Sequence, residues 1–421
     1  MRFNGVFNKI CIIYATGAFG GTRLLFSTLL TYYFSNENST NIVLSDISFV
    51  LAINLFFTIG FSMVLLKDIS LAPQEANEIE NRYKIESLVG LLSGIFFITL
   101  AFSFDVVAHP ILCIALLVSI TFYQNLRHKL LALKLFRKLT VVELVIMLQI
   151  CLGVTLLTYI ELIEAVYLFL VFITPYLFIF FGAIMTFRLK AKMSINFSKI
   201  KESMFVGFSN GLSGALSWLI PPLILPFVAT SMSYVMTATT FLLGMVMLIP
   251  RVFVNAKLPE FIKAINAPDD SSYKKIYTSL RRVMLLIYLP LLVFSNSYFM
   301  LLDMSDGINF TGSDYLLVSL IITFGYLSQF ALLDTLTLNM SERSSIVLKY
   351  NFLYFFFSSS LVFTTIAILD THQSLVVYSI YSLLIIIVLV RNFFLRRYCK
   401  LSRLNLYNTN LTNFTSGGQK V

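Results

Sequence analysis

Long runs of apolar residues alternate with short polar segments along this chain. A helix that crosses a membrane needs about 20 mostly apolar residues, and twelve stretches meet this requirement. They are residues 9–34, 46–66, 85–104, 108–126, 139–160, 163–187, 204–228, 233–256, 281–302, 314–337, 348–369 and 373–395. The pattern predicts an all-α polytopic membrane protein with twelve transmembrane helices.

Lys and Arg are concentrated in every second connection between these stretches. Basic clusters occupy segments such as 127–138 and 188–201, whereas "SNENSTN", "ELIE" and "DMSDGINFTGSD" in the alternate connections contain neither residue. An excess of Lys and Arg in short loops marks the cytoplasmic side. The alternation predicts cytoplasmic N- and C-termini, and it leaves only Arg23 and Arg251 outside the cytoplasmic loops and tail.

The basic segment 188–203 divides the predicted helices into six and six. An even number per half gives both halves the same orientation, so we expect two six-helix lobes related as a parallel repeat. The expected domains are an N-terminal lobe with the central cytoplasmic loop (1–203), a C-terminal lobe (204–397) and an Asn- and Thr-rich cytoplasmic tail (398–421). The polar composition of this tail predicts disorder.

Composition excludes several classes of function. The chain is 58% hydrophobic and 12% charged, against about 25% charged in a soluble domain, so the net charge of +10 belongs to membrane loops and not to a nucleic-acid surface. The four Cys are scattered without metal-ligand spacing, and no metal or cofactor is expected. Motifs of the HExxH, GxSxG, Walker A and CxxC types are absent from the sequence, so we expect neither an enzyme nor ATP-driven transport.

Arg23 lies about halfway along the first predicted helix. At helical spacing, Thr16, Gly20 and Ser27 share its face, whereas Leu24 lies on the opposite side. A charged residue at mid-span costs about 2.5–3.5 kcal/mol on insertion scales and is a functional-site hypothesis by default. Forked guanidinium donors fit phosphate oxygens, so the predicted function is an anion site. The alternatives are snorkelling or a structural pair with Asp334.

A second stripe of small and polar residues lies in the seventh predicted helix. It comprises Ser203, Gly207, Asn210, Gly214 and Ser217. GxxxG pairs occur at residues 17–21 and 207–211, in matching helices of the two halves, and such pairs usually mark close helix packing. Two such stripes predict a watered cleft between the lobes, with Asn210 and Ser217 among the cavity residues.

Three further ionisable residues fall within predicted helices. Arg251 either snorkels to the cytoplasmic surface or contributes to the cavity. Asp334 is either one member of a structural salt bridge or a carboxylate that couples transport to a cation. Glu143 lies in the first turns of the fifth helix, where the helix dipole favours a carboxylate, and it is a second candidate for coupling.

The predicted architecture resembles that of the flippases of the multidrug/oligosaccharidyl-lipid/polysaccharide (MOP) exporter superfamily. Over residues 1–397 the chain looks like a bacterial O-antigen flippase of the Wzx type, most suggestively in "PRVFVNAKLPEFIKA", "YKKIYTSLRRVMLLIYLPLLVF" and "GSDYLLVSLIITFGYLSQFALLDTLTLNMSERSSIVLKYN". The resemblance implies two MATE-like lobes that move an undecaprenyl-diphosphate-linked oligosaccharide from the cytoplasmic to the periplasmic leaflet of the bacterial inner membrane by alternating access. It also implies Arg23 as a diphosphate ligand, a role in lipopolysaccharide biosynthesis, and membrane lipid, a polysaccharide polymerase and a chain-length regulator as partners.

Three other classes of protein are alternatives to this interpretation. A major-facilitator transporter would carry a GxxxDRxGRR-like loop after the second helix, which "KDISLAPQEANEIENRYK" does not resemble. A membrane-embedded polysaccharide polymerase, which is an enzyme, would need a large outer loop with acidic and basic residues. A cation-coupled drug exporter of the same superfamily shares the topology, although it would more often carry acidic groups in its first helices. This exporter is the main alternative.

Overall fold

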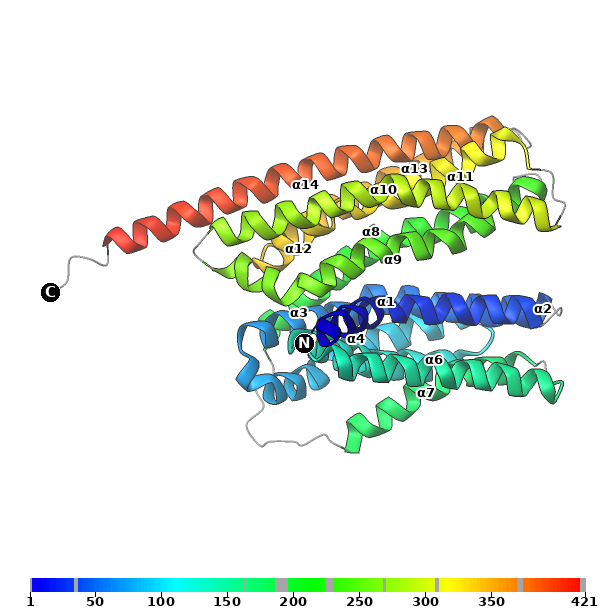
Figure 1. Cartoon of the computed structure of the whole chain (residues 1–421), viewed down its shortest axis with the longest axis horizontal. Coiled ribbons are helices and arrows are strands. Elements are labelled where there is room, and N and C mark those ends of the chain that lie inside the picture. Colours follow the sequence, from blue (N-terminus) through cyan, green and yellow to red (C-terminus); the bar gives the residue numbers. More distant parts are fainter. Residues whose placement is uncertain are drawn as a thin grey trace. The chain divides into compact units, whose positions relative to one another are not determined.

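The computed structural model describes residues 2–33, 37–162, 164–185, 196–224, 230–267, 270–306, 310–368 and 374–416. These residues fold almost entirely into helices, and no strand occurs among them. The chain divides into two compact units, Met1–Gly211 and Leu212–Val421. We call them unit 1 and unit 2 and describe each by itself (Figure 1).

Unit 1 contains seven helices and the first turns of an eighth. They are α1 (Arg2–Tyr33), α2 (Glu37–Phe57), α3 (Ile59–Leu71), α4 (Ala76–Phe102), α5 (Pro110–Ala132), α6 (Phe136–Tyr159), α7 (Ala165–Met185) and the beginning of α8 (Phe197–Ile224), with a 3-10 turn at Pro73–Glu75. The most extensive pairings are α1 with α6 and α5 with α7. Large side chains such as Phe26, Tyr123, Phe172 and Tyr176 are buried in its core.

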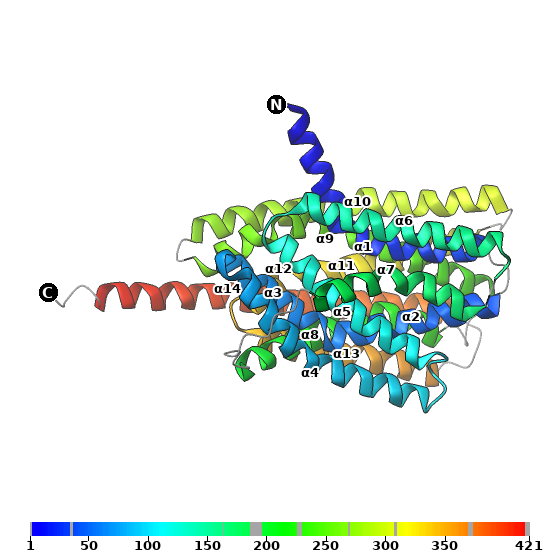
Figure 2. The same cartoon turned by 90° about the horizontal axis from the view of Figure 1, so that it is seen from below.

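Unit 2 contains the rest of α8 and six further helices. They are α9 (Thr230–Asn266), α10 (Asp270–Asp306), α11 (Gly312–Gln329), α12 (Leu332–Met340), α13 (Ser344–Ile368) and α14 (Ser374–Ser416). The helix α11 packs against α9 and α14, and α13 packs along α14. The C-terminal part of α14 extends beyond α13 in both views (Figure 1, Figure 2).

The all-helical, polytopic fold class is confirmed. Each of the twelve predicted spans coincides over most of its length with one helix or a consecutive pair of helices. Within the described residues, eight helical segments are long and apolar enough to cross a membrane, or nine if the bent pair of α2 and α3 is one span. Large apolar side chains face outward from these segments, as in a lipid-facing surface: Leu92, Ile111, Leu152 and Leu286 are 68%, 80%, 69% and 74% exposed.

Two predicted spans are interrupted, in each case without a proline at the break. The helices α2 and α3 meet at 49° around Thr58, whose hydroxyl donates to the Asn54 side-chain oxygen at 2.6 Å. The helices α11 and α12 are separated at Phe330 and Ala331. Side-chain hydrogen bonds near Thr58 and contacts from α14 near Phe330 account for these breaks.

Two features differ from the expected domain layout. The division between the units falls within α8, at Gly211 and Leu212, and not in the segment 188–203. The helix α14 continues to Ser416, through most of the tail expected to be disordered. In this tail Leu401, Leu404, Leu411 and Phe414 recur at helical spacing, and no Gly or Pro interrupts the run before Gly417, so the sequence supports an amphipathic continuation.

Candidate functional site

Arg23 faces the interior of unit 1. Its charge acts on the carboxyl group of Glu143 in α6 and on the phenol of Tyr176 in α7. The rotation of α1 is fixed one turn later by Phe26, whose ring lies 4.9 Å from that of Phe172 in α7. The predicted partner of Arg23 in a purely structural role was Asp334. The carboxyl group of Glu143 is within reach of this charge because α1 packs along α6, and the alternative pair with Asp334 stays a prediction.

Glu143 is the centre of a buried polar cluster. Its side chain is 1% exposed. The Tyr123 hydroxyl donates to Glu143 Oε1, and Arg127 Nε lies 3.4 Å from the same oxygen. Tyr123 and Arg127 are four residues apart on α5 and therefore reach Glu143 from one face. The helix dipole at the start of α6 is thus not the main support of this carboxylate. It is held by a guanidinium and a phenol.

The described part of this cluster contains two guanidinium groups, from Arg23 and Arg127, and one carboxylate, from Glu143. Guanidinium groups offer forked donors that suit an anion. Sequence reasoning placed Arg127 in the connection after the fourth predicted helix, whereas in the structure it lies within α5 and is 8% exposed. The sequence did contain a signal for this cluster. Tyr123 and Arg127 are four residues apart on one helix, and the next helix contains the acidic residue Glu143. Nothing in the sequence pointed to Tyr176.

Arg251 approaches the end of α11 in unit 2. Its Nε donates to Gln329 Oε1 at 3.0 Å, and Gln329 Nε2 donates to Ser328 Oγ at 3.2 Å. Gln329 is the last residue of α11. The Arg251 side chain is solvent-accessible in the structure. Its Nε is oriented by the hydrogen bond to Gln329, at the break between α11 and α12. Both alternatives for Arg251, snorkelling and a place in the cavity, therefore stay predictions.

Arg391 caps the same broken span from α14. Its Nη2 donates to the Ser328 carbonyl oxygen at 2.9 Å, and the neighbouring Asn392 donates to the Leu327 carbonyl oxygen at 2.8 Å. The guanidinium also lies 4.4 Å from the Tyr354 ring centroid. Helix C-termini leave carbonyl groups unpaired and carry a partial negative charge, which a cation stabilises. Sequence reasoning counted Arg391 with the basic residues of the cytoplasmic tail, and in the structure it lies within α14 and is 5% exposed.

Asp334 lies in the first turn of α12, directly after the break, and is 2% exposed. The Tyr277 hydroxyl donates to Asp334 Oδ1 at 2.8 Å, and Arg281 Nη1 donates to the Tyr277 oxygen at 2.9 Å. These contacts come from α10, within unit 2. Asp334 is therefore stabilised by its own unit, through a phenol that is oriented by a guanidinium.

The remaining predicted cavity residues are only partly placed. The side chains of Thr16, Ser27 and Ser217 lie outside the described part of the structure. Gly20 is half-buried in α1. Asn210 Nδ2 lies 3.0 Å from the sulfur of Met63, so this part of the stripe on α8 packs against α3. Whether the stripes of α1 and α8 line a common cleft stays a prediction.

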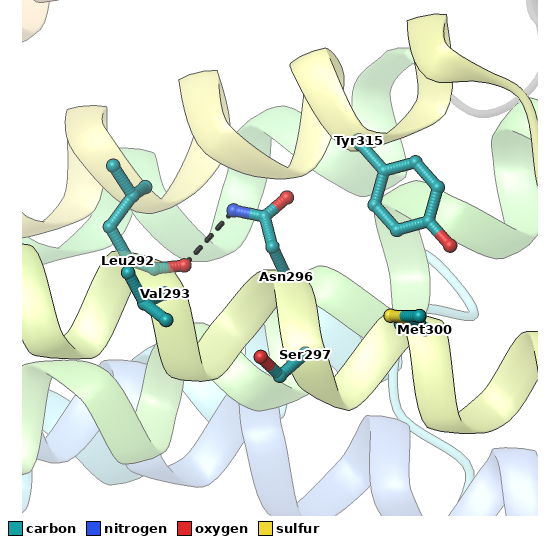
Figure 3. Close-up of a pocket in the computed structure, with 6 residues that line it drawn as sticks. All are labelled: Leu292, Val293, Asn296, Ser297, Met300 and Tyr315. Carbon is teal, nitrogen blue, oxygen red and sulfur yellow. Dashed lines mark hydrogen bonds between the residues drawn. The ribbon is translucent and has the colours of Figure 1, made fainter.

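A pocket of about 440 Å³ lies between α10 and α11 in unit 2 (Figure 3). It is lined by Leu292, Val293, Asn296, Ser297, Met300 and Tyr315. The Asn296 amide donates to the Leu292 carbonyl oxygen at 2.9 Å and to Ser319 Oγ at 3.1 Å. The pocket contains none of the predicted site residues. Within the described residues, no group of three or more His, Cys, Asp or Glu is arranged to hold a metal ion.

The fold is that of the MATE transporters of the MOP superfamily. A crystal structure of a MATE protein in complex with MaD3S matches with a TM-score of 0.73 at 11% identity, over 95% of this chain and 97% of that chain. A eukaryotic MATE transporter matches with a TM-score of 0.68 at 10% identity, over 96% and 99% of the two chains.

A third solved structure is a MOP superfamily transporter from Pyrococcus furiosus, with a TM-score of 0.65 at 11% identity over 94% of both chains. No family model and no curated protein matches the sequence. At these identities the similarity shows the fold alone, and the substrate has to be argued from the charged residues of this chain.

Proposed function

We propose that the protein is a flippase that moves an undecaprenyl-diphosphate-linked oligosaccharide, such as an O-antigen repeat unit, between membrane leaflets by alternating access. The MATE-like fold supports transport. The observation that supports this choice of substrate is the presence of arginines within the helices of both units. Arg127 contacts Glu143 in unit 1, and in unit 2 Arg251 and Arg391 donate hydrogen bonds to neutral acceptors, Gln329 Oε1 and the Ser328 carbonyl oxygen.

A diphosphate headgroup needs fixed positive charge in order to leave water. Desolvating an anion is costly unless it is paired, and arginine keeps its proton while offering forked donors to phosphate oxygens. We assign the diphosphate contacts to Arg23 and Arg251, which are the two least buried of the four arginines. Thr16, Gly20, Ser27, Asn210 and Ser217 are the proposed path residues for the remainder of the headgroup.

The two buried carboxylates suggest different roles under this proposal. Glu143 is held by Arg127 and Tyr123, so it supports the position of the cations around it. Asp334 accepts a hydrogen bond from the neutral phenol of Tyr277. A carboxylate held by a phenol exchanges its proton or a bound cation more readily than one held by a guanidinium. Asp334 is therefore the stronger candidate for coupling.

A cation-coupled drug exporter is the alternative, and the polarity of the charged groups argues against it. A pocket for cationic drugs needs carboxylates that are not neutralised by arginine. For the Pyrococcus furiosus transporter, reverse polarity of the binding pocket suggests a different function. Charge polarity is thus a reasonable criterion for separating functions within this fold.

The test is reconstitution of the purified protein in liposomes that contain an undecaprenyl-diphosphate-linked oligosaccharide, with leaflet exposure measured by an enzyme that reads only the outer leaflet. We expect flipping by the unmodified protein, partial flipping by Arg23→Lys and none by Arg23→Gln. Ethidium uptake into the same liposomes serves as the comparison. Ethidium transport without lipid flipping would overturn the proposal in favour of the drug exporter.

A further inference from the structure

The helix α8 belongs to both units. Its first turns, up to Gly211, fall in unit 1, and the remainder falls in unit 2. In unit 1 this first part lies along α3, the short helix that follows the bend at Thr58. Because one continuous helix enters both units, any movement of one unit against the other must either bend α8 or detach its first part from α3.

Two reciprocal ion pairs join these helices. Lys67 of α3 lies 2.9 Å from Glu202 of α8, and Lys199 of α8 lies 3.1 Å from Asp68 of α3. The pairs are largely shielded from solvent, with Lys67 3% and Glu202 12% exposed at the side chain. Each helix therefore contributes one cation and one anion to the same contact.

The charges are tied further into unit 1. Asp68 also accepts hydrogen bonds from Arg82 at 3.0 Å and from Tyr83 at 2.9 Å, both in α4. Burial lowers the pKa of Lys199, but Asp68 and Glu202 outweigh this effect and raise that pKa above its usual value. Lys199 thus keeps its charge at physiological pH while the two helices are in contact.

Next to the ion pairs, the backbones of α3 and α8 are in direct contact. A Cβ atom at Gly60 would overlap the backbone of Ser203 and Gly207, and one at Gly207 would overlap the Phe56 carbonyl oxygen. Small residues allow such close approach of helices in a membrane. We call this contact of Gly60 with Ser203 and Gly207 the glycine seam. Because glycine has no side chain, the two backbones can separate here without a change of rotamer at either glycine.

Further along α8, aromatic rings pack between α8 and the end of α2. The Phe208 ring lies 6.1 Å from that of Phe56 and 5.4 Å from that of Phe57, both edge-on. Asn210, at the end of the shared segment, reaches Met63. The contact therefore runs from a charged end at Lys199 to an apolar end near Asn210, over about three turns of α8.

We propose that α3 and residues 197–211 of α8 form a gate that is closed in this structure by the Lys67–Glu202 and Asp68–Lys199 pairs and that opens when α8 leaves α3. The inference rests on transport by alternating access, but it does not depend on the identity of the substrate. The ion pairs act as the latch, and the glycine seam lets the helices part and return.

The first test is reversible cross-linking in a variant without the native cysteines. Lys67→Cys with Glu202→Cys, whose native side chains meet at 2.9 Å, should be cross-linked by a short bis-methanethiosulfonate reagent, and the bridge should abolish transport until a reductant is added. The matched control is Asn77→Cys with Lys129→Cys, whose native side chains meet at 2.8 Å between α4 and α5 of the same unit. This control should cross-link without arresting transport. Continued transport by the bridged Lys67 and Glu202 variant would overturn the gate.

The second test needs no substrate. In vesicles exposing the Lys67 end of α3, Ser203→Cys, which is buried in the seam, reports opening through its reaction with a membrane-impermeant thiol reagent. Lys67→Glu places two carboxylates in contact, and we expect labelling to rise about tenfold or more. Adding Glu202→Lys should restore low labelling.

These measurements separate the two proposals. Unchanged labelling in Lys67→Glu would contradict the gate whatever the substrate is. Increased labelling in a protein that flips no lipid-linked oligosaccharide would leave the gate standing and would reject the proposed function.

Discussion

Arg391 donates from Nη2 to the Ser328 carbonyl oxygen at 2.9 Å, across 63 positions of sequence. This contact lies where the tenth predicted span is interrupted. The break between α11 and α12 leaves buried carbonyl groups that need donors, and Arg391 and Asn392 of α14 supply them. The interruption is therefore a property of the packed unit and not of the local sequence.

Arg391→Leu should destabilise unit 2 by about 1–3 kcal/mol, because it leaves a buried carbonyl oxygen without its donor. The measurement is thermal or denaturant unfolding of the purified protein in detergent. Arg397→Leu is the matched control, since Arg397 lies on the same helix and is exposed. Equal stability of the two variants would show that the cap at Ser328 contributes nothing.

Glu143→Gln should cost unit 1 about 3–5 kcal/mol, because it removes the carboxylate that neutralises a buried guanidinium. Adding Arg127→Met should recover most of this loss, since neither charge of the pair then remains. Denaturant unfolding of the single and double variants gives the coupling between the two residues. Additive losses would contradict the pairing, and Glu164→Gln, at an exposed position of the same unit, should be neutral.

Gly60→Ala should prevent α3 and α8 from approaching closely, with an overpacking cost of about 1–3 kcal/mol. The expected result is a lower unfolding temperature and faster thiol labelling of Ser203→Cys. Gly182→Ala is the control, because a Cβ atom there meets nothing within 4 Å and alanine favours a helix. If both glycine variants behave like the unmodified protein, the seam is looser than described.

The orientation predicted from the basic loops can be tested at exposed helix ends. Cysteines at Ser103 and Glu164 should react with an impermeant thiol reagent applied outside intact cells, whereas cysteines at Arg137 and Ser198 should not. All four positions are exposed in the structure, so burial does not explain a difference. Labelling of Ser198 from outside would reverse or invalidate the predicted topology.

Hydropathy was sufficient to predict the helices, because a lipid-facing segment must be apolar over its whole length. It could not predict the breaks near Thr58 and Phe330, which contain no proline. The first depends on the rotamers of Asn54 and Thr58, and the second depends on donors from α14. Tertiary partners of this kind leave no periodic signal in the interrupted segment itself.

Charges near the ends of spans were the main source of error at the candidate site. Arg127 and Arg391 lie where an apolar run ends, so they were counted as loop residues although both are buried. The GxxxG pair at residues 207–211 was expected to mark close packing, and Gly207 does pack against α2 and α3. A Cβ atom at Gly211 would overlap the Phe56 ring, whereas one at Gly21, the equivalent position in the first helix, meets nothing within 4 Å, so the same motif marks different environments in the two helices.

The sharing of α8 between the units has a consequence for protein engineering. Halves of related transporters are natural candidates for exchange, and the basic segment 188–203 is the obvious place to join them. A hybrid joined there would bring a foreign Lys199, Glu202 and Gly207 to a native α3. Such a hybrid should be compatible only if residues 197–211 are taken from the same parent as the first half, which places the functional junction after Gly211.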